Sequence, residues 1–257
     1  MDRRLVLLGA SNLLRGFRPV LRAARAAWGG PVEVLAALGH GRSYGFRSRF
    51  LFRDLPAIVD CGLWRALEER PRRPTRALLT DVGNDIAYGA PPDQILGWAE
   101  ECVRRLRGMD AEVVIAGLPV ERLERLSPLG YRVVRSVFFP FHRWHSLAEA
   151  LASVRTAEEG LRRLAAQHGA TFVPLRPEWY GIDPIHMRPG QWDRGWRAIL
   201  FAPEGAVAPP SAAEPAATPS APRLYLLRPE RRWIFGREQR EPQPALLLPN
   251  GGSVSLY

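Results

Sequence analysis

Five short aliphatic runs, separated by longer segments of helical periodicity, constrain the fold of this chain most. The runs cover residues 5–8, 32–37, 76–80, 112–116 and 171–173. The first of them, Leu5-Val6-Leu7-Leu8, contains no polar residue and predicts a strand buried on both faces. Because strands that alternate with helices usually pair in parallel, the pattern predicts a three-layer, doubly wound α/β/α fold with a five-stranded parallel sheet.

The composition changes after Pro203, which divides the chain into three parts. We expect a main α/β domain at residues 1–203, a linker at 204–222 and a β-rich C-terminal extension at 223–257. The linker is nearly all Ala, Pro, Ser and Gly, a composition typical of flexible or extended segments.

The extension carries short apolar runs that predict strands, among them residues 224–227. Its last two runs, 246–248 and 254–257, flank two glycines and predict a hairpin. A segment of this length offers too few core residues to fold alone. We therefore expect it to pack on the main domain or on a partner subunit, which would make the protein a homo-oligomer.

Charge and composition narrow the functional classes. All 36 basic residues are arginine and the formal net charge is +10. The arginines are dispersed over predicted helix faces without a recognition motif, so we expect no specific nucleic-acid partner, although nonspecific attraction remains possible. The two cysteines, Cys61 and Cys102, are too few for a disulfide framework. No apolar run is long enough for a signal peptide or a membrane span, so we expect a cytoplasmic protein without membrane insertion.

Residues that can take part in catalysis follow several of the predicted strands. Ser11 follows the first strand, Gly41 the second, Asn84 the third, and Asp183 and His186 the fifth. Because the carboxyl ends of parallel strands meet at one edge of a sheet, these residues can converge there. A serine nucleophile needs a base, an acid that orients the base, and donors for the oxyanion. The Asp-Pro-Ile-His spacing lets the carboxylate reach back to Nδ1 of the histidine.

These segments resemble a known family. In order, Gly9-Ala10-Ser11-Asn12, Gly41, Gly83-Asn84-Asp85 and Asp183-Pro184-Ile185-His186 are similar to the four blocks of the SGNH (GDSL-type) hydrolases, over residues 4–200. The resemblance implies a flavodoxin-like fold and a serine esterase or acyl hydrolase. It makes Ser11 the nucleophile, His186 the general base and Asp183 its orienting acid.

The same resemblance implies an oxyanion hole formed by the backbone N–H groups of Ser11 and Gly41 and by the Asn84 side chain. Gly39 is an alternative to Gly41, because the loop holds both glycines. The chain departs from the family pattern at Ala10, where an aspartate usually precedes the nucleophile.

The sequence indicates the type of reaction more closely than it indicates the substrate. We expect a small-molecule ester, with Asn12, Arg42, Ser43 and Asp85 as candidate contacts to a polar or anionic alcohol portion. A scaffolding role for Arg42, Ser43 and Asp85 is an equal alternative. Neither a metal nor an organic cofactor is implied. His142 and His145 have the spacing of helical metal ligands but lack a third ligand nearby. An acyltransferase with the same acyl-serine, a catalytically inactive binding protein of the same fold, and a basic nucleic-acid-binding protein remain alternatives.

Overall fold

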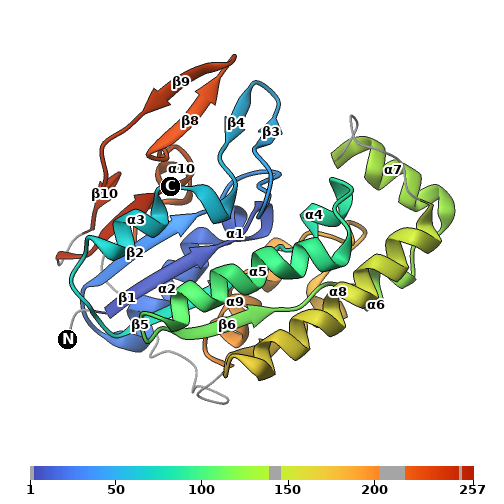
Figure 1. The fold of residues 1–257 in the computed structure, drawn as a ribbon, viewed down its shortest axis with the longest axis horizontal. Helices are drawn as coiled ribbons and strands as arrows, with labels where there is room; N and C mark the ends of the chain where they lie inside the picture. The colour runs from blue at the N-terminus through green and yellow to red at the C-terminus, as the bar shows by residue number, and fades with distance from the viewer. Residues whose placement is uncertain (1–2, 139–145, 203–217, 249–250) are drawn as a thin grey trace.

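A seven-stranded sheet forms the centre of the computed structural model, which describes residues 3–138, 146–202, 218–248 and 251–257 (Figure 1). The strand order is β10-β11-β2-β1-β5-β6-β7, and all neighbours pair in parallel except β10 with β11. These strands are β1 (Arg3–Leu8), β2 (Val32–Ala37), β5 (Thr75–Leu79), β6 (Glu112–Ala116), β7 (Thr171–Val173), β10 (Leu246–Leu247) and β11 (Ser253–Leu256).

Helices cover both faces of this sheet. Leu5 and Leu7 of β1 pack in one apolar cluster with α2 (Phe17–Trp28) and α9 (Trp192–Leu200). Val6 and Leu8 point the other way, into a cluster with α3 (Leu63–Glu68), α5 (Pro92–Arg107) and α8 (Leu147–Gln167). Successive residues of a strand face opposite sides, so an uninterrupted aliphatic run can fill two cores at once. The predicted three-layer α/β/α fold is confirmed.

Shorter elements lie at the ends and edges of the three layers. The site loops carry α1 (Ser11–Arg15) and α4 (Asn84–Ala87), and an arm beside α8 carries α6 (Val120–Glu124) and α7 (Pro128–Phe138) (Figure 1). The described residues also include three 3₁₀ turns: η1 (Ile58–Asp60), η2 (Pro177–Trp179) and η3 (Pro189–Gln191).

The C-terminal segment extends the main sheet. Residues 246–247 and 253–256 form the predicted antiparallel hairpin, and β11 pairs with β2, with Val254 opposite Val34. The expected five parallel strands are present, and β11 and β10 widen the sheet by two. Val254 and Leu256 of β11 are buried in the apolar cluster around α2 and α9, and Tyr257, which follows β11, is buried in the cluster on the other face. A short segment that cannot build its own core thus uses the core of the main domain.

A second, four-stranded sheet joins distant parts of the chain. Its order is β3-β4-β8-β9, with β3 (Ser48–Phe50), β4 (Arg53–Leu55), β8 (Arg231–Ile234) and β9 (Arg237–Arg240). Figure 1 shows these two hairpins projecting beyond the end of the main sheet near α1. The strand predicted at residues 224–227 is wrong, because Ala221–Tyr225 form helix α10. Leu224 is buried against the cluster around α2, while Leu226 is 76% exposed, so this aliphatic run has a helical and not a strand burial pattern.

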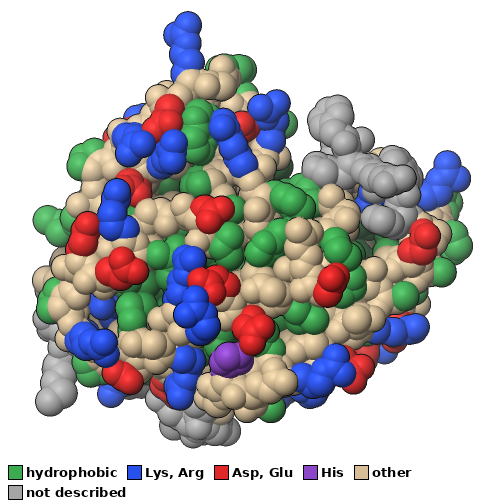
Figure 2. Space-filling model, viewed as in Figure 1, with side chains coloured by type: hydrophobic (Ala, Val, Ile, Leu, Met, Phe, Trp, Pro, Cys, Tyr) green, Lys and Arg blue, Asp and Glu red, His purple; other side chains and the backbone are tan. Residues whose placement is uncertain are grey.

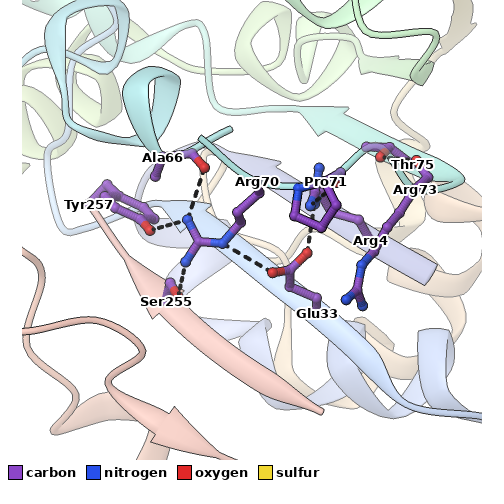
Figure 3. A network of polar contacts seen from close by, with 9 residues as sticks. All are labelled: Arg4, Glu33, Ala66, Arg70, Pro71, Arg73, Thr75, Ser255 and Tyr257. Carbon is purple, nitrogen blue, oxygen red and sulfur yellow. Dashed lines mark hydrogen bonds and ion pairs between the residues drawn. The ribbon is translucent and has the colours of Figure 1, made fainter. Parts of the chain in front are cut away.

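Arg70 ties the C-terminal strand to the main domain (Figure 3). Its guanidinium donates to the Ala66 carbonyl at 3.0 Å, the Tyr257 hydroxyl at 3.1 Å and the Ser255 hydroxyl at 3.5 Å. Its Nε donates to Glu33 of β2 at 3.0 Å. One side chain therefore links α3, β2 and β11.

Arg70→Ala is expected to destabilise the protein by about 2 kcal/mol, because it leaves several partly buried acceptors without their donor. For a chain of this size that corresponds to a fall in Tm of about 4–8 °C. The matched control is Arg72→Ala, whose ion pair with Asp110 joins side chains that are 74% and 87% exposed. The control should change the unfolding free energy by less than about 0.5 kcal/mol. Equal Tm values for the two variants would contradict this role of Arg70.

The molecular surface mixes charges of both signs. On the face shown in Figure 2, arginine and carboxylate side chains are interspersed. Of the helices in the described ranges, none combines the length and apolar character that a membrane crossing needs. The same residues include no group of three His, Cys, Asp or Glu side chains placed to bind a metal ion. His142, His145 and linker residues 204–217 lie outside the described residues.

Candidate active site

A chain of hydrogen bonds connects Ser11, His186 and Asp183. Ser11 Oγ lies 2.9 Å from His186 Nε2, and His186 Nδ1 lies 2.7 Å from Asp183 Oδ2. Ser11 begins α1 directly after β1, whereas His186 lies in the connection between β7 and α9. The His186 side chain is 6% exposed. The structure thus brings together the three residues that the sequence blocks predict as nucleophile, base and orienting acid.

The environment of Asp183 favours its carboxylate form. Burial alone would raise its pKa, but hydrogen bonds from the His186 ring and from the backbone N–H groups of Ile185 and His186 lower the pKa below its usual value. The backbone donors lie 3.1 and 3.2 Å from Asp183 Oδ1. An ionised Asp183 accepts a hydrogen bond from the Nδ1–H of His186, and in this tautomer the lone pair of Nε2 can accept a proton from Ser11.

Three candidate oxyanion donors lie on adjoining loops. The Ser11 N–H is the first of helix α1 and therefore has no intrahelical acceptor. Asn84 begins α4, and its Nδ2 lies 3.4 Å from the Arg42 carbonyl oxygen, next to Gly41. Gly41 has φ +62°, and a Cβ there would lie 2.7 Å from the Tyr88 hydroxyl, which donates to the Gly41 carbonyl. Both the left-handed backbone and the close approach require glycine at this position.

Gly39, the alternative donor, has a different environment. A Cβ on Gly39 would lie 2.4 Å from Leu55 Cδ1, so this glycine packs closely against β4. The Gly39 carbonyl accepts the Arg42 N–H at 3.3 Å, which closes the loop around Gly41. The assignment of the oxyanion N–H to Gly41 stays a prediction, favoured by this packing.

Asp81 holds the nucleophile loop and was not among the predicted site residues. Its Oδ2 accepts the backbone N–H groups of Ala10 at 2.8 Å and Leu13 at 3.2 Å. Its Oδ1 accepts the Asn12 side-chain amide at 3.0 Å. Asp81 immediately follows β5 and has φ +61°, a conformation that Asp and Asn tolerate better than most residues. Its position at the end of a strand was the available sequence signal.

Asn12, next to Ser11, connects helix α1 to the loop that carries His186. Besides contacting Asp81, its Nδ2 donates to the Ile185 carbonyl at 2.8 Å, and its Oδ1 accepts the Met187 N–H at 2.8 Å. These two hydrogen bonds hold the residues immediately before and after His186. Both polar atoms of the Asn12 amide therefore bind other residues of the protein. Asn12 thus positions the loop around His186 and does not provide the expected contact with substrate.

The expectation that Arg42, Ser43 and Asp85 contact the substrate is wrong, because all three residues are fully buried. The Ser43 hydroxyl and the Tyr44 N–H donate to Asp85, the latter at 3.0 Å. Burial raises the pKa of Asp85 to about 6, although these hydrogen bonds act in the opposite direction. The Ser43 and Asp85 side chains instead fasten the loop after β2 to the start of α4.

Arg42 points away from the nucleophile toward the C-terminal strand. Its Nη1 donates to the Tyr257 carbonyl oxygen and, at 3.5 Å, to the Leu38 carbonyl. Burial lowers the pKa of the guanidinium. Among the described residues, its Nε and Nη2 have no hydrogen-bond partner. Arg42 therefore couples β11 to the loop that carries Gly41.

An apolar cavity of about 130 Å³ adjoins the site on the side of β5 and β6. Asn12, Asp81, Asn84 and Ile185 form its wall toward the triad. Its remaining wall comes mostly from apolar side chains around α6, α7 and α8, among them Leu118, Leu123, Leu126, Val134, Leu151 and Val154. The arrangement can hold an apolar group next to Asn84.

His40 lies on the opposite side of the site, in the loop after β2. Burial lowers its pKa to about 4, with smaller contributions from the charges of Arg15, Arg53 and His186. Its Nε2 lies 2.7 Å from the Tyr225 hydroxyl of α10, and its ring stacks on Phe50 with centroids 4.9 Å apart. The His40 imidazole is therefore neutral at neutral pH.

This depressed pKa predicts a pH-dependent stability. Below the unfolded-state pKa of about 6.5, the unfolded chain takes up a proton at His40 that the folded protein does not accept until about pH 4. Stability is therefore lost as the pH falls from about 6.5 to 4. With solvent screening of this partly exposed ring, the loss attributable to His40 is about 1–2 kcal/mol. Urea unfolding at pH 7 and pH 4 should show a correspondingly smaller loss for His40→Gln, and identical losses would contradict the assignment.

Solved structures of other proteins share the fold of this chain. No protein-family model matches the chain, and no curated protein matches its sequence. Est24, a carbohydrate acetylesterase from Sinorhizobium meliloti, is 14% identical with a TM-score of 0.54, over 79% of this chain and 100% of that one. A carbohydrate acetylesterase family member from the same organism is 18% identical with a TM-score of 0.50, over 77% and 98% of the two chains. The chain thus shares its fold with these two acetylesterases.

Proposed function

We propose that the protein is a serine hydrolase that cleaves small-molecule carboxylic esters through an acyl-serine intermediate. The observation that carries this proposal is the hydrogen-bonded order Ser11–His186–Asp183 at the carboxyl edge of the sheet. This order supplies a nucleophile, a base of the correct tautomer and a group that stabilises the protonated base. The two structural neighbours are named as acetylesterases, so ester hydrolysis is known on this fold.

The proposed reaction has two steps. Ser11 Oγ attacks the ester carbonyl carbon and its proton passes to His186 Nε2. The N–H groups of Ser11 and Gly41 and the Asn84 amide stabilise the charge on the carbonyl oxygen. His186 then gives the proton to the departing alcohol, and acyl-Ser11 remains. A water molecule deprotonated by His186 attacks the acyl carbon and releases the acid.

The apolar cavity next to Asn84 suits the acyl group of the ester if that group is apolar. Pocket walls of this composition favour alkyl or aryl groups over sugars, because a buried sugar hydroxyl without a partner loses its hydrogen bonds to water. A cavity of about 130 Å³ suits a short acyl chain of a few carbons.

Labelling with a fluorophosphonate probe tests the proposed nucleophile. We expect one adduct at Ser11, located by peptide mapping, and loss of labelling in His186→Ala, because the hydroxyl then lacks its base. Circular dichroism should show that both proteins are folded. A folded wild-type protein that forms no adduct would overturn the hydrolase proposal in favour of a binding protein of the same fold.

A further inference from the structure

The two sides of Ser11 differ in chemistry. In the sheet, β1 lies between β2 and β5, so the loop after β2 and the loops after β5 and β6 flank Ser11 on opposite sides. The apolar cavity occupies the β5–β6 side. The β2 side carries His40 together with the hairpin β3–β4 and helix α10. An ester bound across Ser11 therefore meets an apolar wall at one end and a different environment at the other.

Two arginines at that other end lack acidic partners. Arg53 begins β4 and is half-buried, and a Cβ on Gly39 would lie 3.7 Å from its Nη2. Arg15 is exposed and follows Ser11 by four residues, which places both on one face of α1. Within the part of the chain that the structure describes, neither guanidinium makes a hydrogen bond or ion pair, in contrast to Arg47 and Arg49, which bind Asp54.

The surroundings of these arginines are positive or neutral. The titratable groups that act electrostatically on His40 are Arg15, Arg53 and His186, and no carboxylate is among them. The titratable groups that act electrostatically on Arg53 are Tyr225 and a further cation, Arg232. Half-burying a guanidinium without a counter-charge is unfavourable, and burial lowers the pKa of Arg53. An anionic ligand would supply the missing charge.

We propose that Arg15, Arg53 and the His40–Tyr225 pair form a subsite for a negatively charged group on the alcohol portion of the ester. The inference rests on the proposed hydrolase function and specifies its substrate class: an apolar acyl group joined to an alcohol that carries a carboxylate or a phosphate. Guanidinium groups match both anions in geometry. The Tyr225 hydroxyl adds a neutral hydrogen-bonding group, and Phe50 forms an apolar wall behind the His40 ring.

Matched substrates test the subsite. Butanoyl glycolate carries a carboxylate on its alcohol portion, and butanoyl glycolamide replaces that carboxylate with a neutral amide of similar size. We expect kcat/KM to be about tenfold higher for the glycolate ester, and the preference to shrink at high salt. The butanoyl ester of 2-hydroxyethyl phosphate, compared with that of 2-methoxyethanol, shows whether phosphate is preferred over carboxylate.

Arg15→Gln and Arg53→Gln should each lower the glycolate-to-glycolamide ratio about three- to tenfold. The control is Arg237→Gln at the exposed tip of the β8–β9 hairpin, which should leave both the rates and the ratio unchanged. Hydrolysis of the glycolamide ester with a ratio near one in the wild type and all variants would overturn the subsite while the hydrolase function stands.

Calorimetric binding of both esters to Ser11→Ala measures the subsite without chemistry. Tighter binding of the glycolate ester, lost on adding Arg53→Gln, supports the subsite even if no ester is cleaved. Equal binding of the two esters would overturn it whatever the outcome of the fluorophosphonate experiment.

Discussion

Ser11→Ala is expected to lower kcat for ester hydrolysis by about 10⁴–10⁶-fold, because it removes the atom that forms the acyl intermediate. The substitution deletes one hydroxyl of a half-buried side chain, and its partner, His186 Nε2, lies 2.9 Å away. The unfolding free energy should therefore change by less than about 1 kcal/mol. Steady-state hydrolysis of butanoyl glycolamide and thermal unfolding measure the two quantities on the same samples.

The members of a catalytic triad act as a unit, and this gives the prediction a second readout. His186→Ala should cost nearly as much as Ser11→Ala, and the double variant should be no slower than the slower single variant. Ser136→Ala, at an exposed position of α7, is the matched serine control and should retain wild-type activity. A residual rate above about one tenth of the wild-type rate in Ser11→Ala would exclude Ser11 as the nucleophile.

The arrangement of Ser11, Asn84, Asp183 and His186 was predictable because each residue follows a recognisable strand or lies at a recognisable spacing in the sequence. Ser11 and Asn84 each follow an aliphatic run that can only be a buried parallel strand, and such strands end at one edge of the sheet. The Asp183–His186 contact is local, since three residues of loop suffice to bring a carboxylate to Nδ1. Short-range spacing and strand order together locate the triad.

Side-chain direction was not predictable in the same way. Arg42, Ser43 and Asp85 adjoin site residues in the sequence, yet all three point into the protein. Arg42 finds its acceptor at Tyr257, the other end of the chain, and no local pattern indicates that contact. Adjacency along the chain places a residue near a site, whereas burial of its side chain depends on partners that only the tertiary fold brings close.

Strands β3 and β4 of the second sheet were missed for a related reason. β3 and β4 span three residues each and are rich in arginine, so they lack the aliphatic periodicity of a buried strand. Arg53 of β4 pairs with Ile234 of β8, and this long-range pairing stabilises both hairpins. Tyr225 of α10 reaches His40 across a similarly long sequence separation, so the proposed anion subsite has no signature in the sequence.

Asp81→Asn is expected to lower kcat/KM about 100-fold, although Asn tolerates the backbone conformation at this position. Asp81 accepts three hydrogen bonds and donates none. An amide can keep its oxygen toward the Ala10 and Leu13 N–H groups, but its nitrogen then faces the Asn12 nitrogen, and two donors meet. If Asn12 turns its amide to relieve this contact, the Ile185 carbonyl loses its donor and the Met187 N–H faces another donor. His186, between these two residues, is displaced from Ser11.

Exchanging the two side chains separates this positioning role from a loss of stability. In the double variant Asp81→Asn/Asn12→Asp, the carboxylate at position 12 accepts from the amide at position 81 and from the Met187 N–H, and only the Ile185 carbonyl lacks a donor. We expect the exchange to recover at least about tenfold in kcat/KM over Asp81→Asn, equivalent to a coupling of about 1–3 kcal/mol. Asn12→Asp alone should be impaired, because it places two carboxylates in hydrogen-bond contact. Additive losses in the cycle would mean that Asp81 supports only the nucleophile loop and that the histidine loop holds its position without the Asn12 connection.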